Sequence, residues 1–209
     1  TDPEKVATMI EAAIAEYGPV DVLVNNVGWT VDRLFMEKPR EEWEKEVKVN
    51  LWGVIHGSRL FARQMIDGHR KGHIVNVASA AAFAPNRKLT AYSTSKAAVH
   101  MLSECLRAEL AEHDIGVTAI CPGFVATGIA TATVYAGASE EEQAQKRAKA
   151  DALYKRRNFS PDDVAEAILK AVLHNPALSL VGAEAWSTRL LSRFAPALSR
   201  RVARIDLTP

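Results

Sequence analysis

The 209-residue chain is long enough for one sizeable domain, and 48% hydrophobic residues suffice for a substantial core. Its 26 Lys and Arg nearly balance 25 Asp and Glu, which excludes the strong positive field of a protein that binds nucleic acid over its whole surface. Cys105 and Cys121 lie in apolar runs without a CxxC motif, so we expect buried, reduced thiols and a cytoplasmic location. No apolar run approaches the roughly 20 residues of a membrane-spanning helix.

Helical and strand-like patterns alternate along the chain. Apolar residues at helical spacing predict helices at Pro3–Tyr17, Glu41–Asp67, Ala91–Glu112 and Pro161–His174. Short apolar runs between them predict buried parallel strands at Val20–Val27, His73–Ala78, Gly116–Cys121 and Leu178–Val181. This alternation predicts an α/β fold with a Rossmann-like, doubly wound parallel sheet.

Two segments near the end of this pattern have informative charges. Ser160, followed by Pro161 and two aspartates, is typical of a helix start, because the hydroxyl caps the helix and acids suit its positive end. Residues 140–157 run from acidic to basic, which also suits a helix. The segment 128–158 is either a solvated helix region or a substrate loop that acts as a lid.

Tyr92 and Lys96 stand four residues apart in a predicted helix, hence on one face. A free tyrosine has a pKa of about 10, and a nearby ammonium favours its ionised form. The pair can therefore act together in proton transfer. Taken alone, the same spacing is also common in helices where both side chains only pack at the surface.

Polar residues follow three of the predicted strands at their carboxyl ends, where open α/β sheets bind ligands. Ser79 follows the strand that ends at Ala78, and its hydroxyl can donate to a substrate carbonyl or cap a turn. The other two turns are Asn25-Asn26-Val27-Gly28 and Pro122-Gly123, with Thr127 close behind. They can shape loops or bind a polar cofactor.

Together these motifs resemble the short-chain dehydrogenase/reductase family over nearly the whole chain. The residues that carry the resemblance are the Asn-Asn-Val-Gly turn, Asn50, Ser79, Tyr92, Lys96, Pro122-Gly123 and Thr127. The resemblance implies an NAD- or NADP-dependent oxidoreductase that interconverts an alcohol and a ketone. It implies that Tyr92 transfers the proton, that Lys96 binds the nicotinamide ribose and lowers the Tyr92 pKa, and that Ser79 holds the substrate oxygen. Asn50 would anchor a water that links Lys96 to solvent.

The same resemblance assigns the binding residues. It implies cofactor contacts at Asn25, Val27, Gly28, Tyr92, Lys96, Pro122, Gly123, Val125 and Thr127. Apolar residues near the catalytic groups predict a pocket for an apolar or lipid-like substrate, lined by Ala80, Phe83 and Phe124, although ordinary packing gives the same composition.

The family begins with a strand and a glycine-rich turn that holds the cofactor pyrophosphate, and the chain has no such turn. We therefore expect roughly 60 residues, on the scale of two βα units, ahead of Thr1. The residue that separates NAD from NADP would lie there, so the choice between them stays open. Without that segment the strand Val20–Val27 would have an unpaired edge.

The C-terminal tail, residues 183–209, is predicted to be a basic amphipathic helix broken near Pro196. It can pack over the pocket, lie on a membrane surface or join a dimer interface, and we expect packing. It resembles bacterial family members thought to handle lipid-like molecules, some fused behind a hydrolase domain. Asn26-Val27-Gly28-Trp29 instead resembles hydroxyacyl-CoA dehydrogenases of the family.

Further alternatives concern activity and assembly. A catalytically silent binding protein of this fold would have no reason to keep Asn50, Ser79, Tyr92 and Lys96 together. Epimerases and dehydratases of the same scaffold add a C-terminal substrate domain, and 86 residues after Gly123 are too few for one. The long helices Glu41–Asp67 and Ala91–Glu112 predict a homodimer or homotetramer.

Overall fold

A four-stranded parallel sheet forms the centre of the computed structural model, which describes residues 2–125, 134–135, 139–156 and 159–205. Its strands are β1 (Val22–Asn25), β3 (Gly72–Val77), β4 (Ile115–Pro122) and β6 (Leu178–Val181), in the order β1-β3-β4-β6. The predicted α/β class and parallel sheet are confirmed. β4 is buried along its whole length, as expected for an apolar strand covered on both faces.

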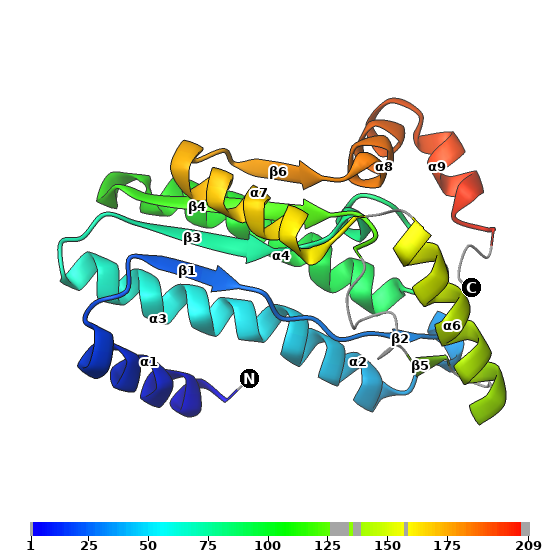
Figure 1. The fold of residues 1–209 in the computed structure, drawn as a ribbon, viewed down its shortest axis with the longest axis horizontal. Helices are drawn as coiled ribbons and strands as arrows, with labels where there is room; N and C mark the ends of the chain where they lie inside the picture. Colours follow the sequence, from blue (N-terminus) through cyan, green and yellow to red (C-terminus); the bar gives the residue numbers. More distant parts are fainter. Residues whose placement is uncertain (1, 126–133, 136–138, 157–158, 206–209) are drawn as a thin grey trace.

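Helices cover both faces of this sheet (Figure 1). The helices of the described ranges are α1 (Pro3–Tyr17), η1 (Phe35–Glu37), α2 (Arg40–Val47), η2 (Lys48–Trp52), α3 (Gly53–Asp67), η3 (Ala80–Ala82), α4 (Thr90–Leu110), η4 (Ala111–His113), α6 (Glu140–Arg156), α7 (Pro161–His174), α8 (Ala183–Phe194) and α9 (Pro196–Val202).

Alternate residues of β3 face opposite layers. Ile74 packs with Met65 of α3 and Leu110 of α4, whereas the next residue, Val75, packs in the cluster that holds Ala171 of α7. Because successive side chains of a strand point to opposite faces, these neighbours divide the core into two apolar layers. The sheet is thus doubly wound.

The predicted helix Glu41–Asp67 consists of three consecutive pieces, α2, η2 and α3. The middle piece, η2, is a π-helical turn, and it contains the buried Asn50. Such widened turns occur mostly as single turns within α-helices, often at functional sites. An apolar pattern of period 3.6 cannot reveal one extra residue in a turn, so the sequence predicted a single helix.

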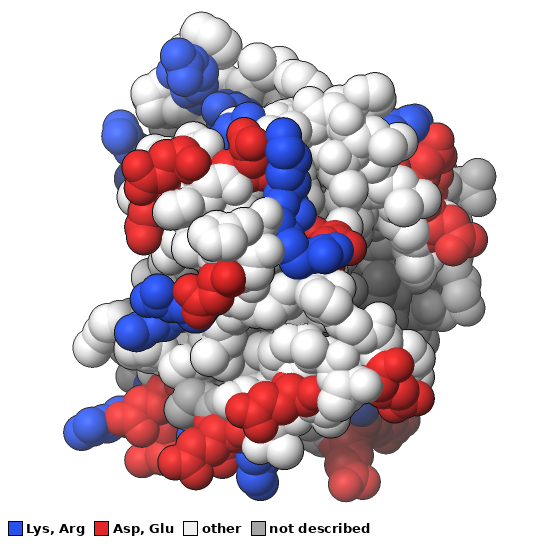
Figure 2. Space-filling model, turned by 90° about the vertical axis from the view of Figure 1, so that its left-hand side faces the viewer, with Lys and Arg blue, Asp and Glu red and all other residues white. Residues whose placement is uncertain are grey.

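All strands of the main sheet point toward the same end of the molecule, where α6, α8 and α9 also lie (Figure 1). A second, two-stranded sheet forms there from β2 (Val31–Asp32) and β5 (Val134–Tyr135). The sequence did not predict it, because two residues are too short for an apolar alternation. The opposite end, where the strands begin, carries acidic and basic side chains mixed over its surface (Figure 2).

The C-terminal tail forms two helices, α8 and α9, which meet at Ala195 before the predicted break at Pro196. The expectation that its apolar residues pack against the body is wrong. Trp186, Leu190, Phe194 and Leu198 are 56%, 49%, 74% and 51% exposed. The reason is that α8 turns its other side inward, with Ala185 fully buried. Within the described ranges, no helix has the length and apolar character needed to span a bilayer.

Candidate active site

Ser79 lies at the carboxyl end of the sheet, two residues after β3 ends. Its Oγ accepts a hydrogen bond of 3.1 Å from the N–H of Ala81 and so caps η3. The same hydroxyl lies near the phenol of Tyr92 and acts to lower its pKa. Ser79 therefore caps a turn, as one reading of the sequence predicted, while its hydrogen bond to a substrate carbonyl stays a prediction.

Lys96 lies one helical turn after Tyr92 on α4, and its ammonium is 5.9 Å from the centre of the tyrosine ring. The side chain is buried, and Nζ donates to the carbonyls of Val27, at 3.0 Å, and Val77, at 2.9 Å. These bonds tie α4 to the ends of β1 and β3. Burial lowers the pKa of Lys96 to about 8.

The structure corrects one expectation about Tyr92. Its pKa is raised rather than lowered, chiefly because burial disfavours the phenolate. The contact with Ser79 acts in the opposite direction, while electrostatic interaction with Glu46 and Cys121 raises the pKa further. Lys96 is not among the groups that shift this pKa, and its ammonium donates to the two carbonyls.

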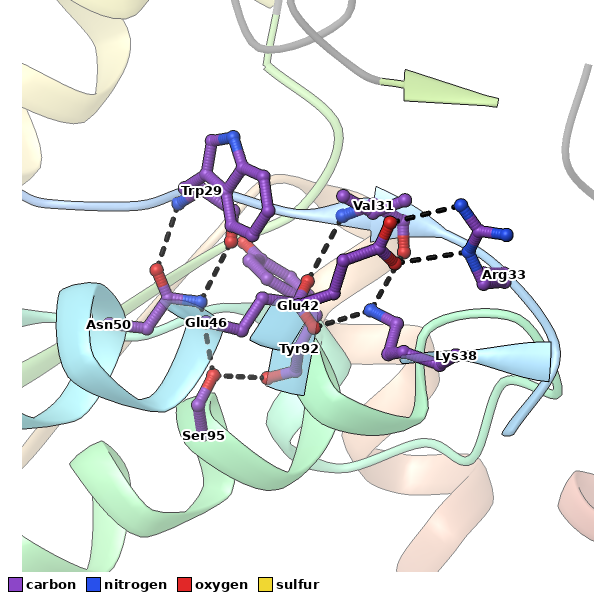
Figure 3. A network of polar contacts seen from close by, with 9 residues as sticks. All are labelled: Trp29, Val31, Arg33, Lys38, Glu42, Glu46, Asn50, Tyr92 and Ser95. Atoms are coloured by element: carbon purple, nitrogen blue, oxygen red, sulfur yellow. Dashed lines mark hydrogen bonds and ion pairs between the residues drawn. The ribbon is translucent and has the colours of Figure 1, made fainter. Parts of the chain in front are cut away.

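Asn50 is fully buried in η2 and holds the backbone of Trp29. Its Oδ1 accepts from the Trp29 N–H at 2.8 Å, and its Nδ2 donates to the Trp29 carbonyl at 2.9 Å and to Ser95 Oγ at 3.2 Å (Figure 3). Both ends of the amide are therefore used by protein groups. The expected link to Lys96 through a water stays a prediction.

In the Asn-Asn-Val-Gly turn the first residue is buried, whereas the last two lie at the surface. The side chain of Asn25 is buried, and its Nδ2 donates to Ser58 Oγ at 3.1 Å and Asn76 Oδ1 at 2.8 Å. It thus fastens β1 to α3 and β3. Val27 and Gly28 are exposed, and a Cβ atom added at Gly28 would lie 3.7 Å from Lys96 Nζ. The turn is an open rim beside the buried ammonium.

The turn after β4 lies along the same edge of the sheet. The Gly123 N–H donates to the Val181 carbonyl at 2.8 Å, and the preceding Pro122 is buried. Val125 is partly exposed. Thr127 lies outside the described residues.

The three predicted substrate residues have different surroundings. Ala80 opens η3 beside Ser79, and Phe124 is 47% exposed. The ring of Phe83 packs edge-to-face on His100 at 5.1 Å and under the guanidinium of Arg189 at 4.9 Å. Phe83 is therefore engaged between α4 and α8.

The two cysteines differ from each other. Cys121 is fully buried in β4, as expected, and burial raises the pKa of its thiol to about 12. Cys105 is exposed, so the expectation that both thiols are buried is wrong for this one. It lies on an outward face of α4, which a single apolar run did not distinguish from the inward face.

A buried ion pair lies close to the residues of the candidate site, and the sequence did not predict it. Lys38 and Glu46 approach to 2.5 Å, with side chains 1% and 0% exposed (Figure 3). Both residues stand in a stretch rich in charges, which is typical of a solvated surface. No pattern of spacing marked this pair as interior.

Comparison with known proteins identifies the family. The sequence model of the short chain dehydrogenase family matches residues 1–137. The chain belongs to this family. Its membership agrees with the parallel sheet and with the tyrosine and lysine on α4.

Curated relatives share 30–40% identity over most of the chain. "Probable oxidoreductase EphD" of Mycobacterium tuberculosis is 40% identical over 207 residues, which are 98% of this chain but 35% of that protein. The 3-oxoacyl-[acyl-carrier-protein] reductase FabG of Thermotoga maritima is 34% identical over 172 residues, which are 81% of this chain and 65% of that protein. The chain thus spans about a third of the length of EphD and about two thirds of FabG.

Solved structures share the fold. A short-chain dehydrogenase/reductase of Burkholderia phymatum, solved in complex with NAD, superposes with a TM-score of 0.80 at 27% identity and covers 100% of this chain and 76% of its own. A short-chain dehydrogenase of Streptomyces avermitilis gives a TM-score of 0.77 at 28% identity, covering 97% and 77%. Both agree with an oxidoreductase of the Rossmann type.

Proposed function

We propose that the protein is a nicotinamide-dependent oxidoreductase that interconverts a secondary alcohol and a ketone. The observation that carries the proposal is the placement of Ser79 beside the Tyr92 phenol, with the buried ammonium of Lys96 one helical turn away. Three polar groups from β3 and α4 converge at the end of the sheet where ligands bind in this fold. The family assignment supports the same chemistry.

The cofactor is NAD or NADP, and the residues present fit its nicotinamide ribose. An ammonium has three N–H donors, and Lys96 uses two on carbonyls of the described residues. The third can bind a ribose hydroxyl, with Tyr92 beside it. The exposed residues Val27 and Gly28 and the turn from Pro122 to Thr127 would complete the cofactor contacts. The NAD complex of the Burkholderia relative supports this assignment.

The nicotinamide ring supplies or accepts the hydride when it is bound. The Tyr92 hydroxyl gives a proton to the carbonyl oxygen in reduction and takes it back in oxidation. A raised pKa keeps Tyr92 protonated, which suits the acid. The Ser79 hydroxyl holds the substrate oxygen, where a hydrogen bond gains strength as negative charge develops. Asn50 keeps Trp29 in place beside them.

For the substrate we favour an apolar or lipid-like molecule. The half-exposed Phe124 follows β4, which ends on the side of the molecule where α8 and α9 lie (Figure 1), and both of these helices carry exposed apolar residues. The segment 128–158 would be the substrate loop, and its described part contains β5 and α6. An acyl thioester is the second candidate, because FabG, which matches 81% of the chain, is named as a 3-oxoacyl-[acyl-carrier-protein] reductase.

A homodimer or homotetramer is also part of the proposal. Trp52 of η2 and Met101 of α4 are 49% and 60% exposed on helices that the family commonly buries between subunits. Large apolar side chains on neighbouring helices are typical of an association surface. Light scattering at micromolar concentration should give a multiple of the chain mass, and a monomer would contradict the proposal.

The function is tested by screening the full-length protein with NAD and NADP against secondary alcohols, ketones and 3-hydroxyacyl thioesters of graded chain length. Absorbance of the reduced nicotinamide reports turnover. We expect one cofactor to be preferred and turnover to rise with apolar chain length. A protein that binds the cofactor but turns over no substrate in either direction would instead be a binding member of the family.

A further inference from the structure

The segment that leaves β1 is held along one edge by partners from several other elements. The Val27 carbonyl accepts from Lys96, and Trp29 exchanges two hydrogen bonds with Asn50. Two residues later, the backbone of the segment meets the buried ion pair. The spacing of every second residue is that of extended backbone, whose N–H and C=O groups alternate between its two edges.

Val31 is the third residue in this row. Its N–H donates to Glu46 Oε1 at 3.0 Å, and its carbonyl accepts from Lys38 Nζ at 3.0 Å. The row ends at Arg33, whose N–H donates to the carbonyl of Lys88 at 3.0 Å. Side chains thus supply most of the hydrogen bonds that a neighbouring strand would make.

Because the Lys38–Glu46 ion pair is buried, its net contribution to stability is small. Desolvating two charges costs much of what their attraction returns, and apolar residues of similar size often replace such pairs without loss of stability. Lys38 and Glu46 each form a further hydrogen bond with the backbone of Val31. The feature that apolar residues could not replace is therefore the position of the pair beside Val31, and not its packing.

The pair is connected to the catalytic residues through two routes. Glu46 precedes Asn50 by four residues on the continuous run of α2 and η2, so both side chains project from one helical face. Both also hold the segment after β1, at Val31 and Trp29 (Figure 3). Lys96 binds the same segment at Val27. A shift of Val31 would move the anchor points of Asn50 and Lys96.

We propose that Glu46, paired with Lys38, is a positioning residue of the catalytic site, which fixes Val31 and thereby keeps Asn50 and Lys96 in register with Tyr92. This inference rests on the proposed oxidoreductase function. It adds an acid from α2 to a site otherwise built from β3, η2 and α4.

The charge of Glu46 also affects the pKa of Tyr92. After burial, which is the largest cause, the carboxylate of Glu46 is among the groups that raise the Tyr92 pKa. The other groups that act on Tyr92 are Ser79, which lowers it, and Cys121, which raises it. Glu46 itself faces Lys38, and Asp32 is a second buried acid on the segment. Neutralising Glu46 should therefore lower the Tyr92 pKa.

The test compares Glu46→Gln with Glu42→Gln in the full-length protein. Glu42 lies one turn earlier on α2 and pairs with Arg33 of the same segment at 2.9 Å, with side chains 22–23% exposed. We expect Glu46→Gln to lower kcat by roughly 10- to 100-fold with KM within about 2-fold, as expected for misplaced catalytic groups. In Glu42→Gln both constants should stay within about 2-fold.

A titration without substrate separates this inference from the proposed function. The ionisation of Tyr92 is read as the ultraviolet difference between each protein and its Tyr92→Phe counterpart. We expect it at lower pH in Glu46→Gln than in wild type, and unchanged in Glu42→Gln. If wild type shows no turnover, the proposed function fails, while the titration still decides whether Glu46 acts on Tyr92.

The double variant Lys38→Met/Glu46→Gln covers the case in which the single variant does not fold, because it leaves no unpaired buried charge. It should show the same loss of kcat and the same direction of titration. The inference is overturned if Glu46→Gln, or the double variant in its place, matches Glu42→Gln in kcat and titration. A change confined to KM and thermal stability would overturn it as well.

Discussion

The ammonium of Lys96 donates a hydrogen bond to the carbonyl of Val27, 69 residues earlier in the chain. With its second bond to Val77, it holds two strand ends together from within α4. The same burial that orients the side chain makes its charge unfavourable. Catalytic position and stability therefore compete at this residue.

The first prediction follows from the Lys96 pKa, which falls from 10.5 to about 8 on folding. Between these values the unfolded chain binds more protons, so this group costs about 3 kcal/mol below pH 8, and the cost disappears as pH rises toward 10.5. Lys96→Met removes that cost but loses two hydrogen bonds from a charged donor, worth about 1.5 kcal/mol each. We expect a free energy of unfolding at pH 7 within about 1 kcal/mol of wild type, with activity lost.

Urea unfolding at pH 7 and pH 10 checks this prediction. The stability of Lys96→Met relative to wild type should fall at pH 10, where wild type no longer buries a charge. A variant that is less stable than wild type by more than about 2 kcal/mol at pH 7 would show that the two carbonyl bonds outweigh desolvation.

The second prediction concerns the proton donor. Tyr92→Phe should lower kcat by roughly 10²- to 10⁴-fold, the usual contribution of a general acid, while cofactor affinity changes by less than about 3-fold. The ring stays to pack, and the lost group is the hydroxyl that lies near Ser79. Steady-state kinetics and cofactor fluorescence titration measure the two effects. Near wild-type turnover would refute the catalytic assignment.

The third prediction concerns stability in acid. His73 is buried in β3 beside Thr118, whose hydroxyl donates to the Pro176 carbonyl, and burial lowers the His73 pKa below 6.5. The unfolded imidazole therefore takes up its proton first. Stability should fall as pH drops below about 6.5, by up to about 1.4 kcal/mol per pH unit for each such histidine. The lowered pKa of His100 acts in the same direction.

Replacing His73 should flatten this dependence. In His73→Gln, the loss of unfolding free energy between pH 7 and pH 5 should be smaller than in wild type. The exposed His113 provides the control, and His113→Gln should follow the wild-type curve. Equal slopes in all three proteins would show that His73 is not the group that titrates.

Local signals explain why several elements were predicted at their observed bounds. Pro3–Tyr17 and Pro161–His174 each begin with a capping residue and a proline, and Ser160 forms the full capping box with Asp163.

The strand predicted at Val20–Val27 is shorter, from Val22 to Asn25. Its outer residues bond elsewhere: the Val20 N–H donates to Gln64 and the Val27 carbonyl accepts from Lys96. Apolar sequence cannot show where a backbone leaves the sheet.

Some residues of the candidate site could likewise be predicted from the sequence, and others could not. Tyr92 and Lys96 are readable because their spacing within one helix already places them on one face. Ser79 follows from the end of an apolar strand. The Lys38–Glu46 pair depends on where α2 packs against the segment after β1, and a charged helix face gives no sign of that contact. Interactions between distant segments are the part that sequence patterns do not contain.

The last prediction concerns the exposed face of the tail. Trp186, Leu190 and Phe194 follow one another at intervals of four residues on α8, and all are 49–74% exposed. Residues 183–205 contain five arginines and one glutamate, in a chain whose net charge is +1. A second copy would oppose arginines to arginines across a two-fold axis, whereas an anionic lipid surface attracts them by about 1 kcal/mol for each nearby charge. Exposed aromatic and leucine side chains add apolar contact with the bilayer.

We therefore expect the full-length protein to co-sediment with vesicles that contain anionic lipid, and salt to weaken this binding. The triple variant Trp186→Ser/Leu190→Ser/Phe194→Ser should lose it while its unfolding free energy stays within about 0.5 kcal/mol of wild type, because surface substitutions rarely cost more. Leu169→Ser/Leu173→Ser is the matched control, since both leucines are exposed on α7, at 64% and 77%, outside the tail. If the triple variant instead changes the oligomer mass and leaves vesicle binding untouched, the tail meets another subunit. A large loss of stability would mean that the face is packed in solution after all.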